Sequence, residues 1–125
     1  MNTLTTALAV GVAAAAGATA RYVIDQYVRY RRPGAFPLGT WLINISGSFL
    51  LGLLAGLSTG HGLPEQAVRI FGTGFCGAYT TFSTFSYETI LLSKKEQTGL
   101  AILYSLSSLV AGLSAGAVGL GVGAL

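Results

Sequence analysis

The chain has 125 residues, and only 9% of them are charged, against about 25% in an ordinary soluble domain. Hydrophobic residues make up 52% of the chain, and the mean hydropathy is +0.66. This composition excludes a soluble enzyme, a nucleic-acid-binding protein and a disordered chain. The net charge of +3 comes from a few Arg and Lys residues between apolar stretches, so it is a topology signal.

Long uncharged stretches dominate the chain. They cover residues 1–20, 33–64, 70–87 and 97–125. Each is near or above the ~20 residues that a membrane-spanning helix needs, so the sequence predicts an all-α membrane protein with four transmembrane helices in one domain. The expected spans are 4–28, 37–58, 66–93 and 98–122. Four helices of this length bury little surface, and we therefore expect an oligomer.

The first span is rich in Ala, Val and Leu and continues past Arg21. A cleaved signal peptide would carry Lys or Arg ahead of the apolar stretch, and this chain has none there. Arg21 lies four residues before Asp25, so the two share one helix face. Two interpretations stay open: a salt bridge between them, or a fixed positive charge in a water-filled vestibule that attracts anions.

The second span contains Asn44 between two isoleucines. Its amide can bond across to another helix, or it can act as a neutral hydrogen-bond donor that holds an anion without trapping it. Glycines recur at small-xxx-small spacing in this span and in the fourth, which predicts close helix–helix contact in lipid. They are Gly52, Gly56 and Gly60 in the second span, and Gly112, Gly116, Gly119 and Gly123 in the fourth.

The third span is the most irregular of the four. Gly72, Gly74 and Gly77 precede a Thr- and Ser-rich stretch at 80–86, and such a sequence is a poor continuous helix. At membrane depth a broken helix is tolerated only where it is buried in protein or lines a cavity, so we expect a functional break near residues 76–80. The alternative is that these small residues only permit close packing.

Hydroxyls and aromatic rings follow the expected break. Ser83 and Thr84 are candidate donors to an anion, although Ser and Thr in lipid-embedded helices often bond to their own backbone. Phe82 and Phe85 share a helix face, and an aromatic edge is electropositive and can face an anion. Glu88 suits either a proton-coupled transporter or a hydrogen-bond anchor for the broken segment.

The loops carry unequal charge. The loop between spans one and two lies on the same side as the loop between spans three and four. Together these loops hold five Lys or Arg residues, whereas the other side has only Arg69. Because positively charged loops stay in the cytoplasm, we expect the termini outside it. In the fourth span, Tyr104 and Ser108 place two hydroxyls on one helix face.

Three sequence blocks carry a more specific signal. They are Gly17-Ala-Thr-Ala-Arg21, Gly39-Thr-Trp-Leu-Ile-Asn44-Ile-Ser-Gly-Ser-Phe49, and Gly74-Phe-Cys-Gly77 continuing into Thr80-Thr-Phe-Ser-Thr-Phe85. In these blocks the chain resembles the bacterial fluoride channel family known as Fluc or CrcB. Their order and spacing fit that family along essentially the whole chain, and the third block is the most specific.

The resemblance implies two four-helix subunits that assemble antiparallel, with dual topology, in the cytoplasmic membrane. Two fluoride pathways would run along the dimer interface, and the third helix would be broken at its centre. Backbone carbonyls there, those of Gly77 and Thr80, would bind one structural Na⁺. Arg21 would be the vestibule arginine, and Glu88 matches the carboxylate after the motif. The residues implied for the fluoride pathway are Asn44, Phe82, Ser83, Thr84, Phe85, Tyr104 and Ser108.

Fluoride holds its water tightly, so a selective pore must offer close hydrogen-bond donors in place of that water. Transport would be passive export that lowers the toxicity of intracellular fluoride. An antiparallel homodimer needs one sequence to insert both ways, which works best without a Lys/Arg bias. The bias of this chain therefore leaves two partners open, a second copy or an oppositely oriented homologue.

Two other functions fit the sequence less well. A small proton-coupled drug antiporter needs a carboxylate deep in a helix, and the first span has none before Asp25. A non-transporting assembly subunit would leave the cluster of Phe, Thr and Ser unexplained. No catalytic constellation is present, because His61 stands alone in a loop and Cys76 has no His or Asp at useful spacing. We therefore expect no enzyme activity.

Overall fold

The computed structural model describes all residues from 1 to 125, and every regular element in it is helical. The elements are α1 (Thr3–Arg31), α2 (Leu38–His61), α3 (Glu65–Val68), the π-helix η1 (Arg69–Cys76), α4 (Gly77–Tyr79), α5 (Ser83–Lys94) and α6 (Thr98–Ala124). The prediction of an all-α chain is confirmed. Three of these helices, α1, α2 and α6, are long and apolar enough to cross a membrane.

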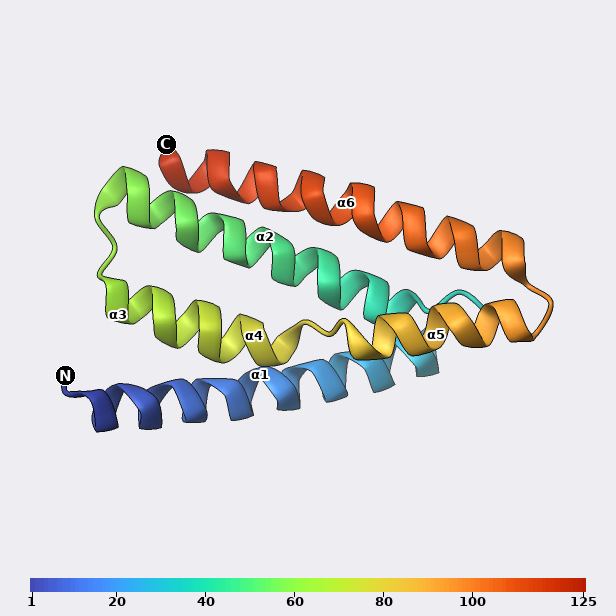
Figure 1. Cartoon of the computed structure of the whole chain (residues 1–125), viewed down its shortest axis with the longest axis horizontal. Coiled ribbons are helices and arrows are strands. Elements are labelled where there is room, and N and C mark those ends of the chain that lie inside the picture. The colour runs from blue at the N-terminus through green and yellow to red at the C-terminus, as the bar shows by residue number, and fades with distance from the viewer.

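Figure 1 shows the helices as long rods, with both termini and the α2–α3 turn at one end of the molecule. The α1–α2 loop and the α5–α6 turn lie at the opposite end. This arrangement confirms the expected grouping of the loops. Five Lys or Arg residues cluster at one end, whereas Arg69 is at the other, where its guanidinium bonds Glu65 at 2.6 Å.

Local signals in the sequence fix several helix ends. Asn2 begins α1, because its side-chain oxygen accepts the Thr5 N–H at 2.8 Å. Gly62 ends α2 with φ +66°, a left-handed conformation that costs glycine little. Pro64 then precedes the next helix, where its missing N–H is no loss.

The third span is one bent rod built from α3, η1, α4 and α5 (Figure 1). In η1 the hydrogen bonds widen to five residues, as in the bond from the Gly77 N–H to the Gly72 carbonyl. The break itself lies at residues 80–82, where Thr80 is extended with ψ 158°. It is therefore displaced by a few residues from the expected 76–80, because the wide helical turns carry the helix through the glycines.

Gly74 of η1 packs closely against α1. A Cβ on Gly74 would meet the Val10 carbonyl, and a Cβ on Gly17 of α1 would meet the backbone of Phe75. Close packing and a helix break therefore both occur in the third span, in consecutive segments.

The strongest helix pairing joins α2 to α6. A Cβ on Gly52 would meet the Gly116 carbonyl, and one on Gly119 would meet the Phe49 carbonyl. The same holds farther along the pair, where Gly56 faces the backbone at Leu120. The predicted contact between small-residue faces is confirmed, and the two backbones touch without side chains between them.

Adding one methyl group at this contact is expected to destabilise the protein. In Gly52→Ala the new Cβ collides with backbone, which cannot rotate away, so we expect a loss of about 1–3 kcal/mol. Thermal unfolding in detergent, followed by the monodisperse fraction, measures the loss. The matched control is Gly121→Ala on α6, where nothing lies within 4 Å of the added Cβ. Equal melting temperatures for the two variants would contradict the close contact.

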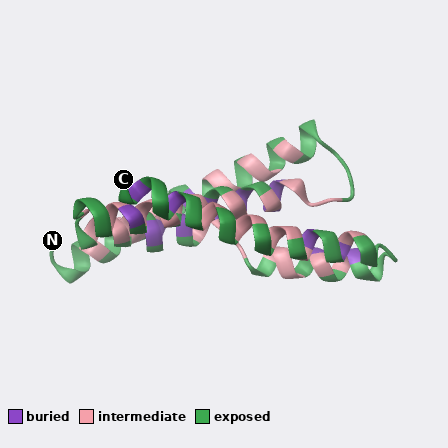
Figure 2. Cartoon of the chain, turned by 90° about the horizontal axis from the view of Figure 1, so that it is seen from above, coloured by how far each residue is buried: buried purple, intermediate pink, exposed green.

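Few side chains are buried within one chain, and Figure 2 shows green, exposed surface along most of the helices. Only 16 of 125 residues are buried, so much apolar surface is left for lipid or for another chain. The buried cluster consists of Leu92, Ala101 and Tyr104, where α5 packs on α6. At this end the molecule forks (Figure 2): the end of α1 and its following loop form one arm, and α5 with the start of α6 forms the other.

Candidate functional site

The helix break is held by the side chain of Asn44. Its Nδ2 donates to the Thr81 carbonyl at 2.9 Å, and its Oδ1 accepts the Thr81 N–H at 2.9 Å. This paired contact replaces the two helical hydrogen bonds that the backbone of Thr81 loses at the break. Of the two interpretations of Asn44, bonding across helices is thus observed. One N–H of the amide remains for a second acceptor.

The break leaves carbonyl oxygens free. The Thr80 carbonyl accepts no hydrogen bond, and the Gly77 carbonyl loses its helical donor because the N–H of Thr81 is taken by Asn44. Hard cations bind such oxygens. The chain holds no cluster of three or more His, Cys, Asp or Glu side chains that suits a metal ion. The Ala78 carbonyl likewise lacks its helical donor, the Phe82 N–H, so the break offers several oxygens that fit the expected Na⁺, including those of Gly77 and Thr80.

The two phenylalanines differ in their surroundings. Their ring centroids lie 5.9 Å apart, tilted by 41°. Phe82 is 79% exposed, whereas Phe85 is half-buried against Tyr104, with 5.1 Å between the ring centroids. The structure brings these three predicted residues together beside the break.

The hydroxyls after the break serve partly local roles. The hydroxyl of Thr81 accepts the Thr84 N–H at 3.1 Å, which caps the start of α5. The Ser83 hydroxyl is exposed and lies 3.4 Å from that of Thr81. Thr84 lines two cavities. Ser83 and Thr84 are therefore accessible from outside the helix, as a donor to an anion must be.

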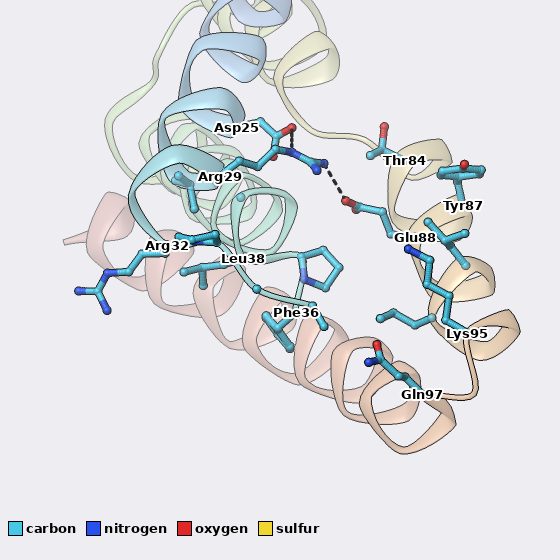
Figure 3. A pocket seen from close by; sticks show the side chains of 18 residues that line it. Asp25, Arg29, Arg32, Phe36, Leu38, Thr84, Tyr87, Glu88, Lys95 and Gln97 are labelled. Atoms are coloured by element: carbon cyan, nitrogen blue, oxygen red, sulfur yellow. Dashed lines mark hydrogen bonds and ion pairs between the residues drawn. The ribbon is translucent and has the colours of Figure 1, made fainter.

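Glu88 is the centre of a charged cluster that links three helices. Its Oε1 accepts the hydroxyl of Tyr104 at 3.0 Å, and its Oε2 bonds Arg29 at 3.3 Å. Arg29 also bonds Asp25, at 2.9 Å. Figure 3 shows this chain of contacts reaching from α1 to α5. Glu88 is thus held as an anchor, the second of the two roles expected for it.

Arg21 is not paired with Asp25, so the salt-bridge interpretation is wrong. Asp25 instead pairs with Arg29, one turn farther along α1. The Nε of Arg21 is buried and has no hydrogen-bond partner. The side chain lines a cavity of about 200 Å³ together with Thr81 and Thr84. An uncompensated guanidinium beside the break favours the vestibule interpretation.

Ser108 lies on α6, one helical turn after Tyr104. Its hydroxyl is buried and has no partner, whereas that of neighbouring Ser107 accepts the Trp41 Nε1 at 3.1 Å. Tyr104 is fully buried within one chain and donates to Glu88. The structure therefore brings Tyr104 next to Phe85, and it leaves the buried hydroxyl of Ser108 without a hydrogen-bond partner.

A cavity of about 510 Å³ opens in the fork at the positively charged end of the molecule (Figure 3). Its walls come from the end of α1, the α1–α2 loop and α5. The charged residues that line it are Asp25, Arg29, Arg32, Glu88 and Lys95. This cavity is the charged mouth from which an ion could approach Thr84 and the break.

Sequence reasoning missed Arg29, which it treated only as part of the positively charged helix end. A signal was present, because Arg21, Asp25 and Arg29 recur every four residues and share one face of α1. The link from Arg29 to Glu88 spans 59 residues of sequence, which no local pattern can reveal.

Comparison with known proteins places this site in a family. The profile described as CrcB-like protein, Camphor Resistance (CrcB), matches residues 8–120. The chain belongs to the CrcB family. The family match covers α1 through most of α6, including the break and the charged cluster. Together with the three long apolar helices, membership makes the chain a multi-pass membrane protein and no enzyme.

Several CrcB relatives carry a functional name. A protein of Leifsonia xyli subsp. xyli named fluoride-specific ion channel FluC 1 is 48% identical over 94% of this chain and 86% of its own length. A FluC 2 from Moorella thermoacetica is 46% identical over 85% of this chain and 86% of its own. A FluC 2 from Rhodococcus jostii is 41% identical over 91% of this chain and 95% of its own length.

Proposed function

We propose that this chain forms a fluoride-specific ion channel that exports fluoride passively across the cytoplasmic membrane and so lowers its intracellular toxicity. The observation that carries the proposal is the near full-length identity of 48% to a protein named for that activity. The structure supports it through the helix break, where hydroxyl donors and two phenylalanine rings lie on accessible surface.

The pathway follows from the chemistry of the ion. Dehydrating fluoride is costly, so donors must replace its water at close range without a full charge that would hold it too tightly. Asn44, Ser83, Thr84 and the edges of Phe82 and Phe85 are such donors. Arg21, in its cavity beside the break, attracts the anion toward them.

The same proposal includes a structural Na⁺ and an antiparallel dimer. The carbonyls of Gly77 and Thr80 would hold the ion, and its charge would stabilise carbonyls that a broken helix leaves without donors. Phe82, exposed by 79% in one chain, would be covered by the second subunit. The two copies of this surface would form two pathways along the single dimer interface.

The partner is either a second copy or an oppositely oriented homologue. The five-to-one distribution of Lys and Arg favours one fixed orientation, with the termini outside the cytoplasm. The numbered names FluC 1 and FluC 2 among the relatives are compatible with paired homologues.

The proton-coupled antiporter is less well supported. It would need a carboxylate that is free to exchange protons for cations. Glu88 is instead engaged by Arg29 and Tyr104. The observed geometry therefore favours a passive channel.

Ion efflux from liposomes tests the proposal. Vesicles containing only the purified chain are followed with fluoride and chloride electrodes in parallel, with protein-free vesicles as the control. We expect fast fluoride efflux without chloride efflux. If neither ion leaves, the experiment is repeated after co-expression with a homologue of opposite charge bias. Chloride efflux as fast as that of fluoride, or no efflux with either preparation, would contradict the proposal.

A further inference from the structure

Glu88 raises an electrostatic problem for an anion channel. Its carboxylate accepts the hydroxyl of Tyr104, whose ring lies 5.1 Å from that of Phe85. Glu88 and Thr84 also line the same cavity at the charged mouth. A full negative charge therefore stands among residues expected to pass an anion. Left alone, it would repel fluoride.

Arg29 is the only cation bonded to this carboxylate. Its guanidinium bonds Glu88 through Nη2 and Asp25 through Nε, so one positive charge serves two carboxylates. Arg32 and Lys95 line the same cavity but form no ion pair there. Without Arg29 the cluster would carry two uncompensated negative charges in place of one.

We propose that Arg29 is a charge-compensating positioning residue for fluoride conduction. It compensates part of the negative charge of the Asp25–Glu88 cluster, so that Glu88 can anchor Tyr104 and α5 beside the pathway with less repulsion of the anion. The inference rests on the proposed fluoride channel function. It adds a second residue of α1, besides Arg21, to those that act on the anion.

A double-mutant cycle tests this role by fluoride efflux from liposomes, using the preparation in which the wild-type protein conducts. Arg29→Gln exposes the charge of Glu88, and we expect fluoride flux to fall by about tenfold or more from the added repulsion. Glu88→Gln keeps an oxygen that accepts the Tyr104 hydroxyl and removes the charge, so the double variant should recover most of the flux. Glu88→Gln alone should lose less flux than Arg29→Gln.

The rescue separates electrostatics from structure. If Arg29 only tied α1 to α5, the double variant would lack the same link and would conduct no better than Arg29→Gln. The matched control is Arg31→Gln, because Arg31 lies on the same helix end and contacts the Tyr27 ring instead of Glu88. It should retain wild-type flux. Size-exclusion profiles confirm that each variant is folded. If Arg29→Gln is not folded, the comparison is made with Arg29→Met, which also removes the positive charge and keeps most of the length of the side chain.

The outcomes are distinct. Flux at the wild-type level in Arg29→Gln, or no recovery in the double variant, would overturn the role of Arg29 while leaving the channel intact. A wild-type protein that conducts no fluoride in any preparation would overturn the proposed function and this inference with it.

Discussion

Asn44→Asp is expected to reduce fluoride efflux by about a hundredfold or more, the largest effect of any single substitution considered for this chain. The reason is twofold. Aspartate lacks the Nδ2 donor, so its second oxygen would face the Thr81 carbonyl across the break. That carbonyl would lose its hydrogen bond, which costs about 1–3 kcal/mol of stability. Its negative charge would also repel an anion directly. Liposome efflux with a fluoride electrode measures the loss.

The control for Asn44→Asp is the same substitution at a helix start. Asn2 caps α1 through its side-chain oxygen, and aspartate caps equally well, so Asn2→Asp should conduct like the wild type. Asn44→Asp with full flux would remove Asn44 from both the break and the pathway.

Phe82→Ile is expected to lower fluoride flux by about tenfold while leaving the fold unchanged. The ring edge that would face the anion is lost, but most of the apolar volume remains. Because Phe82 is 79% exposed within one chain, its replacement disturbs little internal packing beyond the contact with the Phe85 ring. Efflux from liposomes gives the rate, and size-exclusion chromatography shows whether the assembly persists.

Phe71→Ile is the matched control for this ring. Phe71 is also exposed, by 55%, but it lies on η1, in the other half of the bent helix. It should conduct at the wild-type rate. Equal flux in the two variants would argue against a pathway lined by Phe82.

Sequence periodicity and composition determine much of this fold. Uncharged stretches of helical length predict the long helices, and glycine spacing predicts faces for close contact on α2 and α6. The structure shows that these two faces contact each other. The position of the break is harder to predict. Gly72 and Gly74 look like helix breakers, yet they lie in a π-helix, whose wider hydrogen bonding no propensity scale describes.

The candidate site, like the fold, could be predicted from the sequence only in part. Residue types and spacing identify Asn44 and the residues around Phe82 as special, but only the fold shows that Asn44 bonds the backbone of Thr81. The pairing of Arg29 with Glu88 is likewise long-range, and it contradicts the local expectation that Asp25 would bond Arg21. Contacts between distant segments depend on helix packing, which sequence spacing alone does not set.

The π-helix η1 allows the third span to lose one residue without a shift of the helix break. A turn with five-residue hydrogen bonds contains one residue more than an α-helical turn, so it stores the equivalent of a single inserted residue. Losing one residue between Arg69 and Cys76 would tighten the turn and leave Thr81 opposite Asn44. The same loss from α2 would rotate Asn44 by about 100° away from the break. A one-residue deletion within η1 should therefore keep the break in register, whereas one within α2 should not.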